Sequence, residues 1–251
     1  MTSDAVILCQ LALTITPSSP RSIRHKILIL LLKDGPMNKK LKIDIVSDVS
    51  CPWCIIGYQA LHQALSNLAP DIQADITWKP FELNPQMPKE GQEITEHITQ
   101  KYGITVEQSE QNRAAIRDRG LAVGYEFGNR GGGRIYNTFD AHRLLHWAVE
   151  LGKQTELKLA LFDMYFQKSG NPSDHQQLLS VVESIGLDVA EAKQILDSDK
   201  YTSDVRKQQQ FYQAARVSSV PAVIVNDKHL ISGGQPTEVF EQALKQIADQ
   251  S

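Results

Sequence analysis

The sequence predicts an α/β protein in which a βαβ half and a ββα half are separated by a long helical insertion. A strand, a helix and a second strand are indicated within residues 42–83. Helical spacing of apolar residues then prevails from residue 84 to about residue 215, and two short strands and a helix follow. Strict alternation of apolar and polar residues identifies the strands, and apolar residues that recur every three to four positions identify the helices.

Composition and charge are typical of a globular protein without nucleic-acid or membrane partners. Of the 251 residues, 41% are hydrophobic and 22% charged, so a core can form without metals or disulfide staples. The net charge of −3 provides no basic field for nucleic acid or anionic lipid. The longest apolar run, Ile27–Leu32, is far shorter than the ~20 residues of a membrane span and leads to no cleavage site. We therefore expect a cytoplasmic protein.

Residues 1–36 differ from the rest of the chain because they contain no Phe, Trp, Tyr or Glu. They are either an ordinary N-terminal extension, often disordered, or translated upstream sequence before a functional start at Met37. In both cases we expect them to contribute little to the fold, and Cys9 to have no catalytic role.

The βαβ half places a cysteine at a strand-to-helix junction. Apolar residues alternate with polar Asp44, which is the pattern of a half-buried strand. Pro52 suits the first turn of the next helix, whose apolar residues recur at helical spacing up to Pro70. A second strand follows at residues 76–81, and the crossover should be right-handed. Cys51 therefore lies between the first strand and the helix.

Capping residues delimit helices of the insertion, and turn residues separate the last strands. Four helix starts are indicated, by possible capping boxes at Thr105 with Gln108 and Ser173 with Gln176, and by single caps at Asn137 and Asp188. Strands at residues 222–225 and 229–232 precede a helix at about 236–248. This element order is that of a thioredoxin fold with an inserted helical domain. The predicted parts are a non-core extension (1–36), the βαβ half (37–84), the helical insertion (85–215) and the ββα half (216–251).

The Cys51-Pro52-Trp53-Cys54 motif is the predicted reactive group. A thiol attacks a disulfide only as a thiolate, and the free N–H groups at a helix N-terminus stabilise that anion. Cys54 lies one helical turn further along the same face, so it can attack a mixed disulfide at Cys51 and release the partner. We predict Cys51 as the nucleophile and Cys54 as the resolving cysteine.

Zinc binding and plain burial are the alternatives for this cysteine pair. Structural zinc needs two more ligands, usually a second Cys or His pair at short spacing, but the seven histidines are scattered. Only three cysteines occur, too few for a disulfide-framed domain. The position after a strand, inside a βαβ unit, favours redox chemistry, and we expect no metal.

Several residues near the motif have two interpretations. Trp53 could form an apolar wall for a bound peptide or glutathione, or pack over the helix. Asp48 could relay a proton to or from Cys54, or be a solvated loop carboxylate. Pro221 could mark a plain strand boundary or follow a cis peptide bond. Residues 131–133, all glycine, form a flexible connector without a nucleotide role.

Across nearly all of residues 42–248 the chain resembles the DsbA family of thioredoxin-like proteins, and within it the FrnE-like branch. The resemblance implies that Pro221 is cis and faces Cys51, and that the Val220 backbone pairs with an extended substrate peptide. It also links the chain to kappa-class glutathione transferases and 2-hydroxychromene-2-carboxylate isomerases, which typically carry Ser in place of Cys51. The resemblance rests on five blocks in order: Asp48–Gly57, Phe81–Pro85, Asn137–Leu144, Val220-Pro221 and Gly233–Pro236.

We predict a thiol–disulfide oxidoreductase whose partner is an extended peptide, a protein thiol or disulfide, or a small thiol. Both cysteines are retained, which favours dithiol chemistry over a glutathione-dependent isomerase or transferase; a chaperone-like peptide binder is the non-enzyme alternative. No cofactor is expected, with glutathione as an optional co-substrate. Asn84 and Gln235 could line a glutathione groove, or serve as a turn residue and a helix cap. His142 and Arg143 are expected to face solvent or a cleft.

Overall fold

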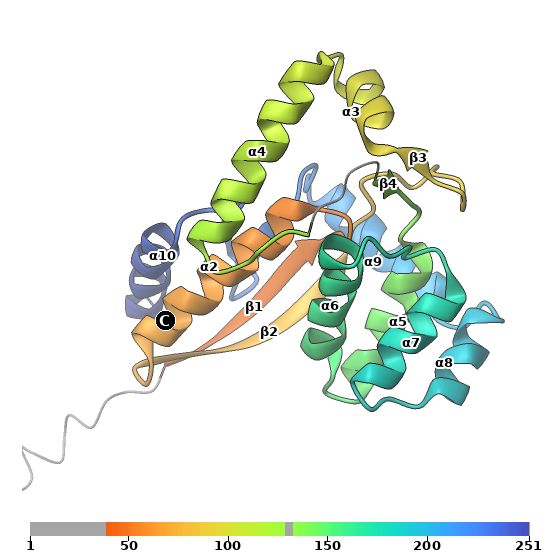
Figure 1. Cartoon of the computed structure of the whole chain (residues 1–251). Helices are drawn as coiled ribbons and strands as arrows, with labels where there is room; N and C mark the ends of the chain where they lie inside the picture. The colour runs from red at the N-terminus through yellow and green to blue at the C-terminus, as the bar shows by residue number, and fades with distance from the viewer. Residues whose placement is uncertain (1–38, 129–132, 251) are drawn as a thin grey trace, which may run out of the picture. The chain divides into compact units, whose positions relative to one another are not determined.

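A four-stranded sheet in the order β2-β1-β5-β6 forms the centre of the fold (Figure 1). The central strand β1 (Lys39–Ser47) pairs parallel with β2 (Ile72–Pro80) and antiparallel with β5 (Ala222–Val225). β5 pairs antiparallel with β6 (His229–Ser232). The predicted βαβ and ββα halves are thus present, and β5 and β6 have the predicted bounds.

The computed structural model describes residues 39–128 and 133–250. The predictions for residues 1–36, with Cys9 and the start at Met37, lie outside the described residues. The same holds for two of the three glycines of the predicted connector, Gly131 and Gly132. In the part of the chain that the structure describes, no helix is long and apolar enough to cross a membrane.

Two helices cover one face of the sheet. α2 (Pro52–Leu68) connects β1 with β2, and α10 (Thr237–Asp249) follows β6 and packs against α2. The core between these helices and the sheet is formed by buried aliphatic and aromatic side chains, including Ile43, Ile45, Ile55, Leu61, Phe240 and Leu244.

The prediction of a half-buried β1 is wrong, because its second face is covered as well. Val46 packs there with Tyr212 of α9 (Thr202–Ala214) and with Ala222. Asp44 is buried on the same face, where it accepts a hydrogen bond from the Tyr212 hydroxyl (3.3 Å) and lies 3.5 Å from Lys79 Nζ. Asp44, the polar residue in the alternating pattern of β1, therefore makes buried polar contacts and does not indicate that this face of the strand is exposed to solvent.

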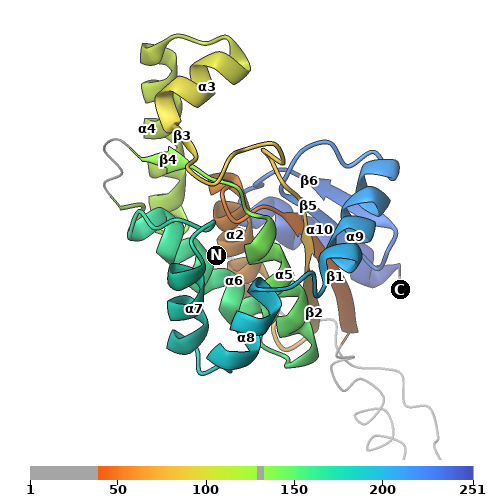
Figure 2. The ribbon, with the colours of Figure 1, turned by 90° about the vertical axis from the view of Figure 1, so that its right-hand side faces the viewer.

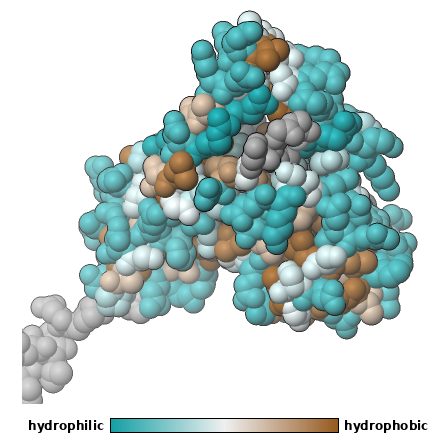
Figure 3. Space-filling model, viewed as in Figure 1, coloured by the Kyte–Doolittle hydropathy of each residue, from teal (hydrophilic) through white to brown (hydrophobic). Residues whose placement is uncertain are grey.

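The insertion is mainly helical, and its elements form two groups (Figure 2). α5, α6 and α9 contact the edge strand β2, with α7 and α8 beside them. α3 and α4 stand apart from this group, and the surface of α4 in Figure 3 is mainly hydrophilic.

The remaining bounds are β3 (Gln92–Glu93), α3 (Ile94–Tyr102), α4 (Val106–Ala122), β4 (Arg134–Ile135), α5 (Phe139–Glu150), α6 (Gln154–Phe162), the π-helical turn η1 (Asp163–Gln167), α7 (His175–Ser184) and α8 (Val189–Leu196). The antiparallel pair β3–β4 was not predicted.

Two predicted helix starts are confirmed. Thr105 Oγ1 accepts from the Gln108 backbone N–H (3.2 Å), while the Gln108 side chain accepts from the Thr105 N–H (2.9 Å), which is a complete capping box. Asp188 caps α8 by accepting from the N–H groups of Ala190 and Glu191.

Two other predicted caps are wrong by one residue. The cap of α7 is Asp174 rather than Ser173, because its carboxylate accepts from two first-turn N–H groups at 2.8 and 3.1 Å. At α5 the N-cap position is Thr138, and Asn137 instead accepts from the Phe139 N–H (2.9 Å). Neighbouring polar residues compete for a helix start, and their spacing alone does not decide between them.

One glutamine side chain joins the insertion to the edge of the sheet. β2 is an edge strand, and Gln154 of α6 completes its pairing at Trp78. The Trp78 backbone N–H donates to Gln154 Oε1 (2.8 Å), and Gln154 Nε2 donates to the Trp78 carbonyl (2.9 Å). Both bonds are buried, so the amide takes the place of a neighbouring strand.

Replacing Gln154 by Ala should lower the free energy of unfolding by about 2–4 kcal/mol, because two buried backbone groups of Trp78 lose their partners. Urea unfolding measures the change. Gln194→Ala, the same substitution at an exposed position of α8, should cost less than about 0.5 kcal/mol. Equal losses in both variants would show that Gln154 does not hold the strand edge.

Candidate active site

The reactive motif begins α2. Cys51 occupies the N-cap position with φ −93° and ψ 113°, and its side chain makes no capping hydrogen bond. Pro52 starts the first turn, where its missing N–H costs nothing. The Cys54 N–H donates to the Cys51 carbonyl (3.1 Å), so the two cysteines lie one turn apart. The local sequence therefore places one sulfur at the helix terminus and the other behind it.

The structure brings Cys51 together with the predicted proline segment, although 169 residues separate Cys51 from Val220. The Cys51 thiol donates to the Val220 carbonyl over 3.6 Å. The Val220–Pro221 peptide bond is cis, as the family resemblance implies. The boundary interpretation of Pro221 is therefore wrong.

Glycines allow α2 to approach the proline segment closely. A Cβ on Gly57 would lie 3.1 Å from Gly234 Cα and 3.2 Å from Pro221 Cγ. A Cβ on Gly234 would lie 3.1 Å from the Trp53 carbonyl oxygen and 3.4 Å from its ring. Trp53 is also 37% exposed, so its ring both packs beside the motif and offers an open apolar face.

The resolving thiol is fully enclosed. Cys54 has 0% exposure, and both cysteines are free thiols. Burial raises the pKa of the Cys54 thiol well above its usual value, and the hydrogen bond and negative charge of Cys51 raise it further. Lys158 acts in the opposite direction. Cys54 is therefore protonated in the dithiol form, and its proton must leave before Cys54 can attack.

Asp48 is buried, so its interpretation as a solvated loop carboxylate is wrong. Its oxygens accept from the backbone N–H groups of Leu83 (2.7 Å) and Ser50 (3.2 Å). His142 Nε2 lies 3.7 Å from Asp48 Oδ1, which is an ion-pair distance and longer than a hydrogen bond. Burial alone would raise the pKa of Asp48, but its interaction with His142 and the Leu83 N–H outweighs burial and holds that pKa below its usual value.

Arg143 faces neither solvent nor a cleft, so that prediction is wrong for Arg143, whereas His142 is buried from solvent and lines a small cavity. Both are buried because α5 packs against the insertion helices. Arg143 donates to the carbonyl of Ile195 in the last turn of α8 and, after the helix, to the carbonyls of Ser198 and Lys200 (3.0 Å to Lys200). Its role in the fold is to satisfy the carbonyl groups at the end of α8.

Asn84 and Gln235 make internal hydrogen bonds. Asn84 Oδ1 accepts from Lys101 Nζ (2.7 Å) and lies 3.0 Å from His97 Nε2, which ties α3 to the loop after β2. Gln235 Nε2 donates to the Ser232 carbonyl (2.7 Å). Their proposed roles in glutathione binding stay predictions.

Two residues at the end of α3 reach the site although no sequence motif indicated them. The charge of Asp48 acts on Lys101, and that of Cys51 on Tyr102. Burial first, and then the charge of Cys51, raises the pKa of Tyr102, whose side chain is 57% exposed. Lys101 Nζ also donates to the Leu83 carbonyl (2.9 Å), whose residue binds Asp48 through its N–H, so α3 supplies an ammonium group beside the loop that holds Asp48.

Lys158 of α6 is the third residue that sequence analysis missed. Its side chain is 0% exposed, and its Nζ has no hydrogen-bond partner among the residues that the structure describes. Nζ lies 5.3 Å from the centre of the Trp78 ring and 4.9 Å from that of Phe162, as cation–π contacts. The signal was present, because this lysine interrupts the otherwise apolar run from Leu157 to Phe162.

No metal-binding group is found among the described residues, since no three His, Cys, Asp or Glu side chains gather there. The polar groups around the motif are instead a carboxylate, an imidazole and an ammonium: Asp48, His142 and Lys158. This arrangement can hold and move protons beside a pair of thiols.

Comparison with known proteins confirms the predicted thioredoxin fold and the family resemblance. Residues 42–245 match the family described as DSBA-like thioredoxin domain. YwbO of Bacillus subtilis (strain 168), an uncharacterized protein, is 28% identical over 204 residues, which are 80% of this chain and 94% of YwbO. The crystal structure of a probable DsbA oxidoreductase from Streptomyces coelicolor is 29% identical with a TM-score of 0.78, covering 84% of this chain and 91% of that one. A 2-hydroxychromene-2-carboxylate isomerase shares the fold, at 16% identity and a TM-score of 0.61, covering 83% of this chain and 97% of that one.

Replacing Asp48 by Asn should lower the free energy of unfolding near neutral pH by about 2–3 kcal/mol, because its hydrogen bonds lose their charge. The pKa of Asp48 is lowered in the folded protein. Its stabilisation is therefore complete above about pH 5 and is lost as the pH falls through the folded-state pKa, below about pH 4.

Urea unfolding of both proteins across this pH range checks the expectation: the stability difference should shrink toward acid pH. Asp118→Asn, at an exposed position of α4, is the matched control and should cost less than about 0.5 kcal/mol. A difference that stays constant with pH would contradict the ionised state of Asp48.

Proposed function

The chain belongs to the family of DSBA-like thioredoxin domains, and we propose that it is a thiol–disulfide oxidoreductase working through Cys51 and Cys54. One observation carries the proposal. The Cys51 thiol sits at the N-terminus of α2 against the Val220 carbonyl, with the enclosed Cys54 thiol one turn behind it. This arrangement suits a nucleophile, Cys51, that contacts the substrate, and a resolving thiol, Cys54, that contacts only Cys51.

The exchange proceeds in two balanced steps. The Cys51 thiolate attacks one sulfur of a substrate disulfide, forming a mixed disulfide and releasing the other substrate sulfur as a thiolate. The Cys54 thiol then loses its proton and attacks Cys51, which closes the Cys51–Cys54 disulfide and releases the second substrate thiolate. The substrate gains the two electrons that the cysteine pair loses, and the reverse sequence oxidises a dithiol substrate.

Substrate would bind across the face formed by Trp53 and the Val220 backbone. An extended peptide can add to this segment as a strand, with Pro52 and Pro221 flanking its sulfur. Lys101 and Tyr102 would border the same face, and an ammonium group there favours substrates with a carboxylate, including glutathione as a small-thiol co-substrate. We place the reaction in the cytoplasm, supported by a cysteine content too low for a disulfide framework.

Cys51→Ser and Cys54→Ser should fail in different ways. Cys51→Ser should abolish insulin reduction by dithiothreitol above the uncatalysed rate, because a hydroxyl is no redox centre and the remaining Cys54 is enclosed. Cys54→Ser should still react once and then accumulate a covalent adduct at Cys51, since nothing releases the bound partner. Insulin turbidity measures the activity, and mass spectrometry of the intact chain measures the adduct.

The outcomes separate the alternatives. Wild-type activity in Cys51→Ser would exclude the redox proposal and leave a peptide binder with incidental cysteines. A glutathione-dependent isomerisation kept by Cys51→Ser would favour the isomerase alternative. If Cys51→Ser, rather than Cys54→Ser, collects the adduct, the roles of the two cysteines are reversed. A Ser109→Ala variant, which alters a buried hydroxyl of α4 outside the motif, serves as the control and should keep full activity.

A further inference from the structure

The proton of Cys54 needs an exit that the substrate does not block. Cys54 has 0% exposure, and its thiol faces Cys51, the side on which a substrate is attached in the mixed disulfide. Water therefore cannot take the proton from that side during release. A base buried within the protein would solve this problem.

Lys158 of the helical insertion is such a group, because the Trp78 and Phe162 rings that its Nζ contacts belong to the same buried cluster as Cys54. Its Nζ is enclosed and lies over the rings of Trp78 and Phe162, and within residues 39–128 and 133–250 it has no hydrogen-bond partner. The charges of Lys158 and Cys54 act on each other. Because no hydrogen bond fixes Nζ, the flexible stem of the lysine allows the amine to reach toward the thiol.

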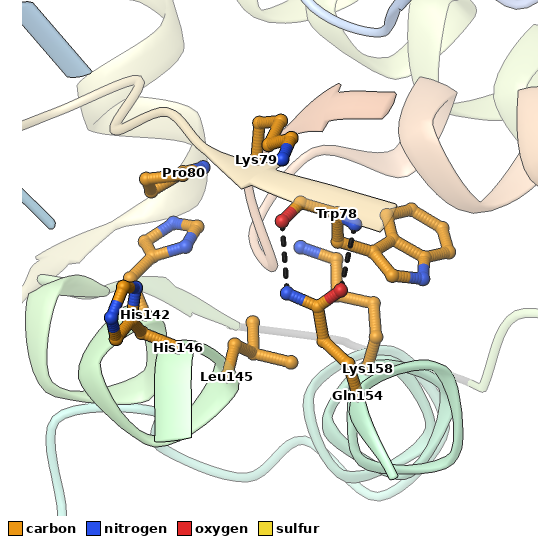
Figure 4. A pocket seen from close by; sticks show the side chains of 8 residues that line it. All are labelled: Trp78, Lys79, Pro80, His142, Leu145, His146, Gln154 and Lys158. Atoms are coloured by element: carbon orange, nitrogen blue, oxygen red, sulfur yellow. Dashed lines mark hydrogen bonds between the residues drawn. The ribbon is translucent and has the colours of Figure 1, made fainter. Parts of the chain in front are cut away.

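A small cavity leads from Lys158 toward the surface. Figure 4 shows Lys158 and Gln154 of α6 facing Trp78, with His142 and His146 of α5 across the same space. The cavity volume is about 10 Å³, close to the least that holds one water molecule. His142 is buried and His146 is partly exposed, so the polar lining runs from the interior to solvent.

We propose that Lys158 is the proton acceptor of Cys54, and that the cavity beside it returns the proton to solvent. The inference rests on the proposed oxidoreductase function and deepens it. In the release step the Cys54 thiol gives its proton to the neutral Lys158 amine, which leaves a thiolate beside an ammonium group. The thiolate attacks Cys51 of the mixed disulfide and releases the substrate thiolate, and the ammonium then loses its proton through the cavity. When a dithiol substrate is oxidised, the same ammonium protonates the departing Cys54 thiolate.

Lys158 suits this role better than its neighbours do. Burial lowers the pKa of Lys158 to about 8, so an appreciable fraction is neutral near physiological pH. Asp48 is the weaker base because its pKa lies below the usual value. The titratable groups that face Lys158 come from every element around it: Asp48, Cys51, Cys54, Lys79, His142 and His146.

The contacts between Cys51 and Cys54 also determine when the proton of Cys54 is transferred. Two of the causes that raise the pKa of Cys54 come from Cys51, namely its hydrogen bond and its charge. Both are lost when Cys51 is bound in a mixed disulfide. The pKa of Cys54 then falls toward that of Lys158, so the proton transfers only after a substrate has been captured.

The aromatic disulfide 5,5′-dithiobis(2-nitrobenzoate) tests the proposal, because each thiol exchange releases one coloured thiolate. All proteins in this test carry Cys9→Ser, so that Cys51 and Cys54 are the only thiols. In stopped flow the first release then reports attack by Cys51, and the second reports attack by Cys54. Lys158→Met should change the rate of the first phase by less than about threefold. It should slow the second by at least about tenfold near neutral pH, since a positioned proton acceptor contributes about 10²–10⁴-fold. As the pH is raised, the rate of the second phase should level off near pH 8 in the wild type and should keep rising in the variant.

Controls separate failure of this inference from failure of the proposed function. Lys168→Met, the same change at an exposed lysine, should alter neither phase. A wild type that releases only one coloured thiolate per chain would contradict the dithiol function itself. Two normal phases in the wild type and an unchanged second phase in Lys158→Met would overturn the role of Lys158 alone.

A measurement on the unchanged chain covers the case in which Lys158→Met does not fold. In an NMR titration of ¹³C-labelled lysine side chains, one lysine should titrate near pH 8, as the pKa of Lys158 requires. If every lysine titrates above about pH 10, the ordinary value, the proposal is overturned.

Discussion

Enclosure of the Cys54 thiol is the constraint on which the rest of the site depends. A thiol at the start of α2 can meet a substrate, but the thiol one turn later is covered by the sheet, by α2 itself and by the insertion. Gly57 and Gly234 let the first turn of α2 pack against Pro221 with almost no space between them. The close packing protects the resolving sulfur and also denies its proton a direct path to water.

The helical insertion supplies what the thioredoxin halves lack. Gln154 joins it to the backbone of the edge strand. Four residues further along α6, Lys158 lies over the rings of Trp78 and Phe162, in the same buried cluster as the cysteine pair. α5 adds His142 next to Asp48. Buried polar groups are costly unless they are paired, and Lys158 Nζ makes no hydrogen bond to any described residue. Its burial is therefore better explained by proton movement than by stability.

The sequence was sufficient for the fold and for the centre of the site, because both depend on local patterns. Alternation and helical spacing indicated the βαβ and ββα halves, and the capping box at Thr105 was correct in detail. The motif itself placed Cys51 and Cys54 at a helix start. Burial was harder to predict, since Asp44 and Asp48 are polar residues that distant helices cover.

The same limit applies to residues far from the motif in sequence. Lys158 comes near Cys54 only because α6 docks on β2, and no spacing in the chain encodes that contact. The one available hint was a lysine within an apolar run, which also occurs where a side chain extends to the surface. The cap of α7 was predicted wrongly for a related reason. Asp174 and Ser173 are both able to cap a helix, and the tertiary fold selects between them.

Equilibration with glutathione buffers of graded redox ratio shows whether Cys54 resolves a mixed disulfide formed at Cys51. The full chain is acid-quenched at each ratio, and mass spectrometry of the peptide that contains residues 51–54 identifies the product. We expect a single two-electron transition to an intramolecular Cys51–Cys54 disulfide, seen as the loss of two hydrogen atoms. A stable end product with glutathione on Cys51 and a free Cys54 thiol would contradict it, because the enclosed cysteine would then not resolve the mixed disulfide.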